Sequence, residues 1–343
     1  MRRWFVTLLI SLAAGISLPG HAAVLAKGTP PKDPNLRTLD SLLQQPEERI
    51  DLARAEVAIE RMIDPSVDEK ATLGLLDAWA SRVKARLPQG EAISNDTKVG
   101  VLASTLYQPG PWNDFHPFSY DLDDELGLSI PGKLMSHYLA TRKGNCVSMP
   151  VLFVILGHKL GLPITLAIAP NHVLAKYKRD NGEWMNIEAT TGGTKSDSKY
   201  QEELGITPRA IATGIYLRPL SQREALLVPV DTLMQFYREN RPPEQVMPVT
   251  DAVLKVDPNN IVALLVRRDA YRRIVDDRYA KQYPTPDQMP PSMRDGYMEI
   301  YRNQVALVQK IQSLGWVPET QEHRTGYLRT VEQAKTGQQG GVR

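Results

Sequence analysis

Apolar positions along the chain predict helices at both ends and a small sheet between them. From about residue 36 to 88 apolar side chains recur at helical spacing, and residues 66–69 resemble a capping box at the start of a second helical stripe. Residues 89–132 lack this period and are rich in Pro, Gly and Asp, so we expect an irregular segment. A short helix is expected over residues 133–141.

The central segment combines a buried helix with three strands. The run from Cys146 to Leu160 is apolar on nearly all sides, which indicates a helix surrounded by core. Pro150 has to lie in its first turn, where a missing N–H costs little, so the regular helix begins close to Cys146 or Ser148. Strand-like runs follow over residues 163–169, 172–177 and 183–188, and residues 180–182 (Asp-Asn-Gly) form a hairpin signal between the last two.

Beyond about residue 220 the pattern is helical again, over residues 228–239, 243–256, 260–274 and 296–313. Tyr237 and Tyr271 are separated by the period of a tetratricopeptide repeat, and residues 255–260 lie where such a repeat would turn. We predict one to two degenerate repeats in this region. A plain helical bundle is the alternative.

The first 22 residues have the features of a signal peptide. Arg2 and Arg3 precede an apolar stretch over residues 4–18, and small residues follow at Gly20 and Ala22. The alternative is an uncleaved anchor helix, but we expect an exported protein, periplasmic or secreted. The predicted organisation is a signal peptide (1–22), a flexible leader (23–34), a core with a helical flank (35–220), a helical tetratricopeptide-like module (221–335) and a disordered tail (336–343).

Charge excludes some classes of partner. The chain has 41 basic and 39 acidic residues, and removal of the signal peptide takes away two basic ones and leaves a neutral protein. Electrostatics therefore gives no reason to expect binding to nucleic acid or to an anionic membrane. The acidic run over residues 121–125 lacks the spacing of an EF-hand, so we predict neither a metal nor a cofactor.

Cys146 is the single cysteine and the strongest candidate for chemistry. A lone thiol in an oxidising compartment is a liability unless it is buried or has a task. A helix N-terminus favours a thiolate and an oxyanion, His172 lies at the mouth of a strand pair that can face that helix, and Glu188 lies one strand later. The alternative is a buried Cys146 that acts as a small hydrophobic residue and a His172 that only ends a strand.

Loop length decides whether the histidine and the acid can meet. A two-residue turn at Asn181-Gly182 would put His172 and Glu188 on opposite faces of the sheet, whereas a three-residue loop over 180–182 puts them on the same face. We therefore predict a loop of odd length. We also predict that the Cys146 sulfur lies within roughly 3 to 5 Å of a His172 ring nitrogen.

Four segments resemble the transglutaminase-like superfamily: residues 142–148, 160–163, 170–173 and 186–193. The resemblance is closest to a bacterial branch of this superfamily that has tetratricopeptide-like helices after the core. The resemblance implies an α+β, papain-like core with a Cys-His-Asp triad. It makes Cys146 the nucleophile and His172 the base, with Glu188 at the aspartate position. The branch also contains members that lack the cysteine.

The activity implied by this resemblance is thiol-dependent acyl transfer on amide bonds, and we favour hydrolysis of a peptide or protein substrate over transamidation. The alternative is a non-catalytic exported scaffold whose groove and C-terminal helices bind a protein partner.

Overall fold

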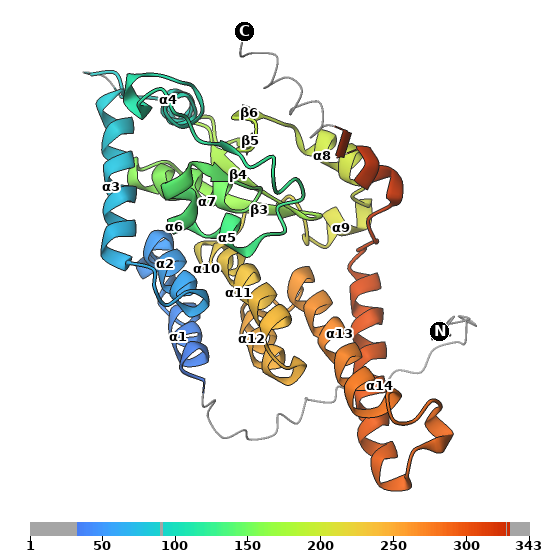
Figure 1. Ribbon diagram of the computed structural model, residues 1–343. Helices are drawn as coiled ribbons and strands as arrows, with labels where there is room; N and C mark the ends of the chain where they lie inside the picture. Colours follow the sequence, from blue (N-terminus) through green and yellow to red (C-terminus); the bar gives the residue numbers. More distant parts are fainter. Residues whose placement is uncertain (1–32, 90–91, 327, 330–343) are drawn as a thin grey trace.

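The computed structural model describes residues 33–89, 92–326 and 328–329 (Figure 1). The predicted signal peptide, the tail over 336–343 and residues 23–32 of the predicted leader lie outside the described residues. The last two residues assigned to the leader are ordered by the first helix. Asp33 accepts a hydrogen bond from the Asn35 N–H and caps α1 (Pro34–Leu43), so the helical flank begins there.

The N-terminal flank is helical, as predicted. Helix α1 is followed by a 3₁₀ turn over residues 47–49, α2 (Leu52–Ile63) and α3 (Glu69–Ala85). The capping box expected over residues 66–69 is not formed in that way. Asp68, rather than Ser66, accepts the bond from the Ala71 N–H, because the helix starts two residues later than a Ser66 cap would require.

The expectation of an irregular segment over residues 89–132 is wrong for its first part. Helix α4 (Asn95–Tyr107) begins after a Ser94 cap and buries Val99, Leu102 and Leu106 at helical spacing. Residues 108–132 are irregular apart from a 3₁₀ turn over residues 111–113, β1 (Ser119–Tyr120) and the short α5 (Ile130–Lys133).

A buried helix and an antiparallel sheet form the centre of the molecule (Figure 1). Helix α6 (Met135–Thr141) leads through β2 (Lys143–Gly144) into α7 (Ser148–Lys159). Strands β3 (Ile164–Ala169), β4 (His172–Lys178), β5 (Trp184–Glu188) and β6 (Gly193–Thr194) then pair in chain order. The predicted helix and the three predicted strands are confirmed, and the regular helix begins at Ser148.

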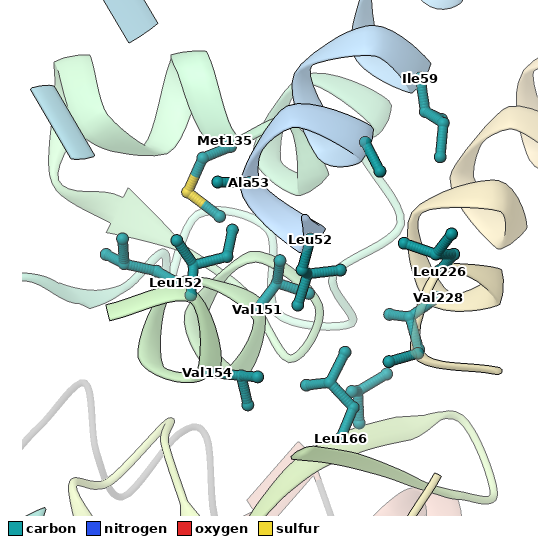
Figure 2. Packing of buried hydrophobic residues seen from close by; sticks show 14 of the residues in the cluster. Leu52, Ala53, Ile59, Met135, Val151, Leu152, Val154, Leu166, Leu226 and Val228 are labelled. Atoms are coloured by element: carbon teal, nitrogen blue, oxygen red, sulfur yellow. The ribbon is translucent and has the colours of Figure 1, made fainter. Parts of the chain in front are cut away.

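Helix α7 lies inside the main hydrophobic core. Residues 148–157 are all buried, so the helix has no solvent face over most of its length. Figure 2 shows its side chains meeting those of α2, β3 and residues 226–228, as drawn for Leu52, Ala53, Val151, Leu152, Val154, Leu166, Leu226 and Val228. Cys146 therefore stands just before a helix that is buried on all sides over most of its length.

The remaining elements are helical: α8 (Asp197–Leu204), α9 (Pro208–Ala212), α10 (Gln222–Ala225), α11 (Leu227–Asn240), α12 (Pro243–Val256), α13 (Ile261–Val275), a π-helical turn over 276–280, a 3₁₀ turn over 286–288 and α14 (Pro291–Ser313). The four helices predicted after residue 220 are confirmed as α11 to α14, which lie side by side in sequence order (Figure 1). The tetratricopeptide repeat stays a prediction.

One hydrophobic cluster runs from α1 through α7 to α13, so the core continues past residue 220. The α+β fold class is confirmed.

Candidate active site

Cys146 lies immediately before α7 and is held there by its neighbour. The Asn145 side-chain oxygen accepts hydrogen bonds from the backbone N–H groups of Val147 (3.0 Å) and Ser148 (3.3 Å), which caps the helix. Cys146 is 8% exposed, and its thiol faces the backbone oxygen of Asn171 at 3.8 Å. The sulfur therefore lies at the N-terminal end of a long buried helix, whose dipole favours negative charge.

A tight hairpin carries His172 to the thiol. Strands β3 and β4 pair as far as Ala169 opposite His172, which leaves a two-residue turn of Pro170 and Asn171. Asn171 has a φ of 53°, in the left-handed region that asparagine tolerates better than most residues. Because α7 packs on β3 and β4, this turn lies beside the N-terminus of α7.

The loop between β4 and β5 has the predicted odd length. Lys178 pairs with Trp184, and the Arg179 N–H donates to the Glu183 oxygen at 2.8 Å, so residues 180–182 form the loop. Gly182 has a φ of 88°, which suits glycine at the last loop position. This register puts His172 and Glu188 on one face of the sheet.

The histidine and the acid are in direct contact. His172 Nε2 lies 2.8 Å from Glu188 Oε2, so Nδ1 is the ring nitrogen left for the Cys146 thiol. Burial alone would lower the pKa of His172, but the Glu188 charge and hydrogen bonds with Cys146 and Glu188 raise it to about 10. His172 therefore stays an imidazolium at neutral pH, which makes it a charge partner for a thiolate and a ready proton donor.

Glu188 is a buried carboxylate with donors on both oxygens. Oε2 also accepts a hydrogen bond from the Tyr200 hydroxyl at 2.6 Å, and Oε1 accepts from the Thr190 hydroxyl at 2.6 Å and the Thr190 N–H at 3.2 Å. Burial would raise the pKa of Glu188, but the His172 charge and these bonds lower it to about 2. The acid is therefore ionised and fixed in direction at neutral pH.

Tyr200 is a site residue that sequence analysis missed. It lies on α8, which was not predicted, and its ring centroid is 5.8 Å from that of His172. A lone tyrosine in a polar helix carries no sequence signal for such a role. Thr190 lies within the family-like segment 186–193, so its position was marked although its contact with the acid was not.

The acidic loop over residues 121–129 covers the thiol. Gly127 has a φ of 60°, and a Cβ at this position would lie 3.5 Å from the Cys146 sulfur and 3.2 Å from the Asn145 Cβ. The Asp124 carboxylate accepts from the N–H groups of Leu128 and Ser129, both at 2.9 Å, and so folds the loop. The loop therefore approaches the site through a glycine.

The large apolar residues in and before this loop differ in burial. Phe118 is buried and packs edge-on against Trp79 and Tyr138, so it belongs to the core. Phe115 is 69% exposed and Leu128 is 61% exposed. Of these two residues, Leu128 directly follows Gly127, the glycine that approaches the thiol.

Among the described residues, no histidine other than His172 forms a hydrogen bond with Cys146 or Glu188. The ring of His158 bonds the Ile164 oxygen at 2.8 Å, and His137 and His116 lie on α6 and in the irregular segment. Within the described ranges no group of three or more His, Cys, Asp or Glu side chains is arranged to hold a metal ion. No helix among the described residues has the length and apolar character needed to cross a membrane.

Comparison with known proteins finds a family match for the central part of this chain. Residues 70–227 match the model of the family described as the transglutaminase-like superfamily, so the chain carries a transglutaminase-like domain.

Two curated relatives come from Buchnera aphidicola. A "UPF0162 protein" of subsp. Baizongia pistaciae (strain Bp) is 28% identical over 163 residues, or 47% of this chain and 58% of the relative. "UPF0162 protein BU173" of subsp. Acyrthosiphon pisum (strain APS) is 27% identical over 192 residues, or 52% of this chain and 66% of the relative. The chain thus spans less than two thirds of the length of each.

Among solved structures, one titled "Crystal structure of menin reveals the binding site for Mixed Lineage Leukemia (MLL) protein" covers 86% of this chain and 88% of its own at 11% identity. Its TM-score of 0.41 is too low to bear on function.

Proposed function

We propose that this protein is a thiol-dependent acyl-transfer enzyme that acts on amide bonds, with Cys146 as nucleophile, His172 as base and acid, and Glu188 as the residue that orients the imidazole. The observation that carries the proposal is that His172 Nε2 lies 2.8 Å from the buried Glu188 carboxylate, on a hairpin whose Asn171 oxygen lies 3.8 Å from the thiol. Such an array, with the nucleophile at a helix start, is what nucleophilic catalysis by cysteine requires.

The reaction begins with the Cys146 thiolate and the His172 imidazolium. The sulfur forms a bond to the amide carbon, and the carbonyl electron pair moves to oxygen, where the backbone N–H of Cys146 donates a hydrogen bond. The pair then returns, the C–N bond breaks, and His172 gives its proton to the leaving amine. Water then attacks the thioester carbon while His172 takes up one of its protons. The C–S bond breaks, a carboxylic acid is released, and the Cys146 thiolate and the His172 imidazolium are restored.

We favour hydrolysis over transfer to an amine. Water is far more concentrated than any amine, so transamidation needs a site that excludes water and holds the amine. The substrate we propose is a peptide or protein, bound beside the loop over residues 121–129. We further propose that the protein works after export, in the periplasm or outside the cell.

The competing proposal is a non-catalytic exported scaffold that binds a protein partner through the same groove and the C-terminal helices. The low exposure of Cys146 is the observation that favours it. A nucleophile has to be reached by its substrate, and this thiol is nearly covered.

Thiol reactivity distinguishes the two proposals. We would measure the rate of alkylation by iodoacetamide from pH 5 to 9 for the wild type, His172→Ala and the control His137→Ala. An activated thiol reacts fast at pH 6 to 7 and slows at least about tenfold in His172→Ala, whereas the control changes little. Slow alkylation that rises only near the ordinary thiol pKa and is the same in all three proteins would support the scaffold.

A further inference from the structure

The side-chain amide of Asn145 is only half used in the structure. Its oxygen accepts two backbone hydrogen bonds and caps α7. Its nitrogen, Nδ2, has no hydrogen-bond partner, and the residue is 0% exposed, so water cannot serve as a partner at the surface. A buried donor without an acceptor is costly, so it is expected where an acceptor arrives only during function.

The direction of this amide is fixed by the cap. Turning the group over would set the NH₂ against the N–H groups of Val147 and Ser148 and would lose both bonds. Since an amide is planar, holding the oxygen towards the helix holds Nδ2 on the side away from it. The free donor is therefore oriented in advance.

Two glycines keep side chains away from this donor and from the thiol. A Cβ on Gly132 would lie 3.2 Å from Asn145 Nδ2. A Cβ on Gly127 would lie 3.5 Å from both the Asn145 amide carbon and the Cys146 sulfur. The amide and the nucleophile thus border the same glycine.

The one carboxylate beside Gly132 does not account for the free NH₂. Asp124 Oδ2 would lie 3.6 Å from a Gly132 Cβ, but the Asp124 carboxylate already accepts from the N–H groups of Leu128 and Ser129 and forms no hydrogen bond to Asn145. Nδ2 therefore has no acceptor among the described residues.

We propose that Asn145 Nδ2 is the second donor of the oxyanion site and that it acts together with the backbone N–H of Cys146. The inference rests on the proposed function. As the sulfur bonds the amide carbon, the carbonyl electron pair becomes a negative charge on oxygen, and Nδ2 donates a hydrogen bond to it. The bond is released when the pair returns and the C–N bond breaks. A neutral carbonyl gains less from this donor than an oxyanion, so the effect falls on the transition state.

Two variants remove the donor while keeping a helix cap. Asn145→Ser and Asn145→Asp both place an oxygen where it can accept from the first helical N–H groups, and aspartate is also isosteric. Serine adds no charge, so the pair separates loss of the donor from the effect of a carboxylate. Asn260 provides the matched control, because it is a buried asparagine that caps α13 by accepting from the Ala263 N–H at 2.9 Å, so Asn260→Asp repeats the exchange elsewhere.

The test compares two reactions of the same sulfur. Alkylation by iodoacetamide displaces iodide and forms no oxyanion, whereas acylation by p-nitrophenyl acetate passes through one and releases p-nitrophenolate in a measurable burst. We expect the ratio of acylation to alkylation rate to fall at least about tenfold in both Asn145 variants and to stay at the wild-type value in Asn260→Asp.

The outcomes separate this inference from the proposed function. An unchanged ratio in both Asn145 variants, with a wild-type thiol that depends on His172, would overturn the oxyanion role and leave the triad standing. Equal losses in both reactions would also overturn it, because they would show that Asn145 acts only as a cap. A wild-type thiol that reacts alike with and without His172 would overturn the proposed function and this inference together.

Discussion

The Tyr200 hydroxyl offers a sharp test of whether Glu188 is the fixed, ionised acid of the site. Tyr200 is 1% exposed, and its hydroxyl donates to Glu188 Oε2 at 2.6 Å, the same oxygen that lies 2.8 Å from His172 Nε2. Tyr200→Phe deletes one oxygen and keeps the ring, so it removes this bond without opening a large cavity.

The magnitude follows from the charge on the acceptor. A hydrogen bond to an ionised group contributes about 1.5–3 kcal/mol to stability, so we expect Tyr200→Phe to lower the free energy of unfolding by about 2 kcal/mol at pH 7. The Thr190 bonds to Oε1 remain, so Glu188 should stay ionised with a higher pKa than in the wild type.

The loss should depend on pH in a defined direction. The pKa of Glu188 is lowered on folding from its ordinary value of 4.5 to about 2, so its contribution to stability is full above pH 4.5 and is lost as the pH falls through about 2. A rise in this pKa in Tyr200→Phe means that the two proteins differ by a constant amount above about pH 5. The difference then shrinks as the pH falls.

Urea unfolding at pH 7 and pH 3 measures both quantities. Tyr177→Phe is the control, because its hydroxyl donates to the half-exposed Asp96 carboxylate at 3.1 Å and lies away from His172. We expect a smaller loss there and no change in the pKa of His172 followed by NMR. A Tyr200→Phe loss below about 0.5 kcal/mol, or one equal at the two pH values, would refute the description of Glu188 as an ionised acid held by Tyr200.

Three further predictions concern packing, a buried acid pair and the acyl acceptor. Gly144→Ala would bring a Cβ to 2.5 Å from the Tyr138 ring. We therefore expect the free energy of unfolding in urea to fall by about 1–3 kcal/mol and the alkylation of Cys146 to slow. Unchanged values for both would contradict the packing argument. Burial and the Glu60 charge raise the pKa of Glu56, and burial raises that of Glu60 from 4.5 to about 7. The stability from Glu60 is therefore full below pH 4.5 and lost as the pH rises through about 7. Glu60→Gln should therefore stabilise the protein more at pH 8 than at pH 5, and an equal change at both would count against the raised pKa of Glu60. With a p-nitrophenyl ester and excess primary amine, mass analysis should find mostly the hydrolysed acid; an amine adduct that disappears in Cys146→Ala would establish transamidation instead.

The central segment was predictable because its signals are local. Pro150 restricts the start of α7 to within one turn. The Asp-Asn-Gly loop determines the register of β4 and β5 once His172 and Glu188 are required to lie on the same face of the sheet. The contact between His172 and Glu188 follows from that register. These features depend on backbone geometry that a short stretch of sequence determines.

Other parts depend on contacts between distant segments and could not be read in the same way. Helix α4 was missed because prolines, glycines and acidic residues dominate the segment after it, although Val99, Leu102 and Leu106 carry a helical period. The approach of Gly127 to Cys146 needs the path of a loop across the N-terminus of α7, and periodicity holds no information on such paths.

The glutamate at position 188 is explained by how its carboxylate is held. The resemblance to the transglutaminase-like superfamily implies aspartate there, and a longer side chain would ordinarily loosen the contact with the histidine. In this chain Thr190 bonds one oxygen and Tyr200 the other, so the carboxylate is positioned by its donors as well as by its own backbone. The added methylene is accommodated because these donors leave Oε2 at 2.8 Å from His172. The acid and its donors therefore form a unit, and a return to aspartate alone would shorten the reach while Thr190 and Tyr200 stayed where a glutamate needs them.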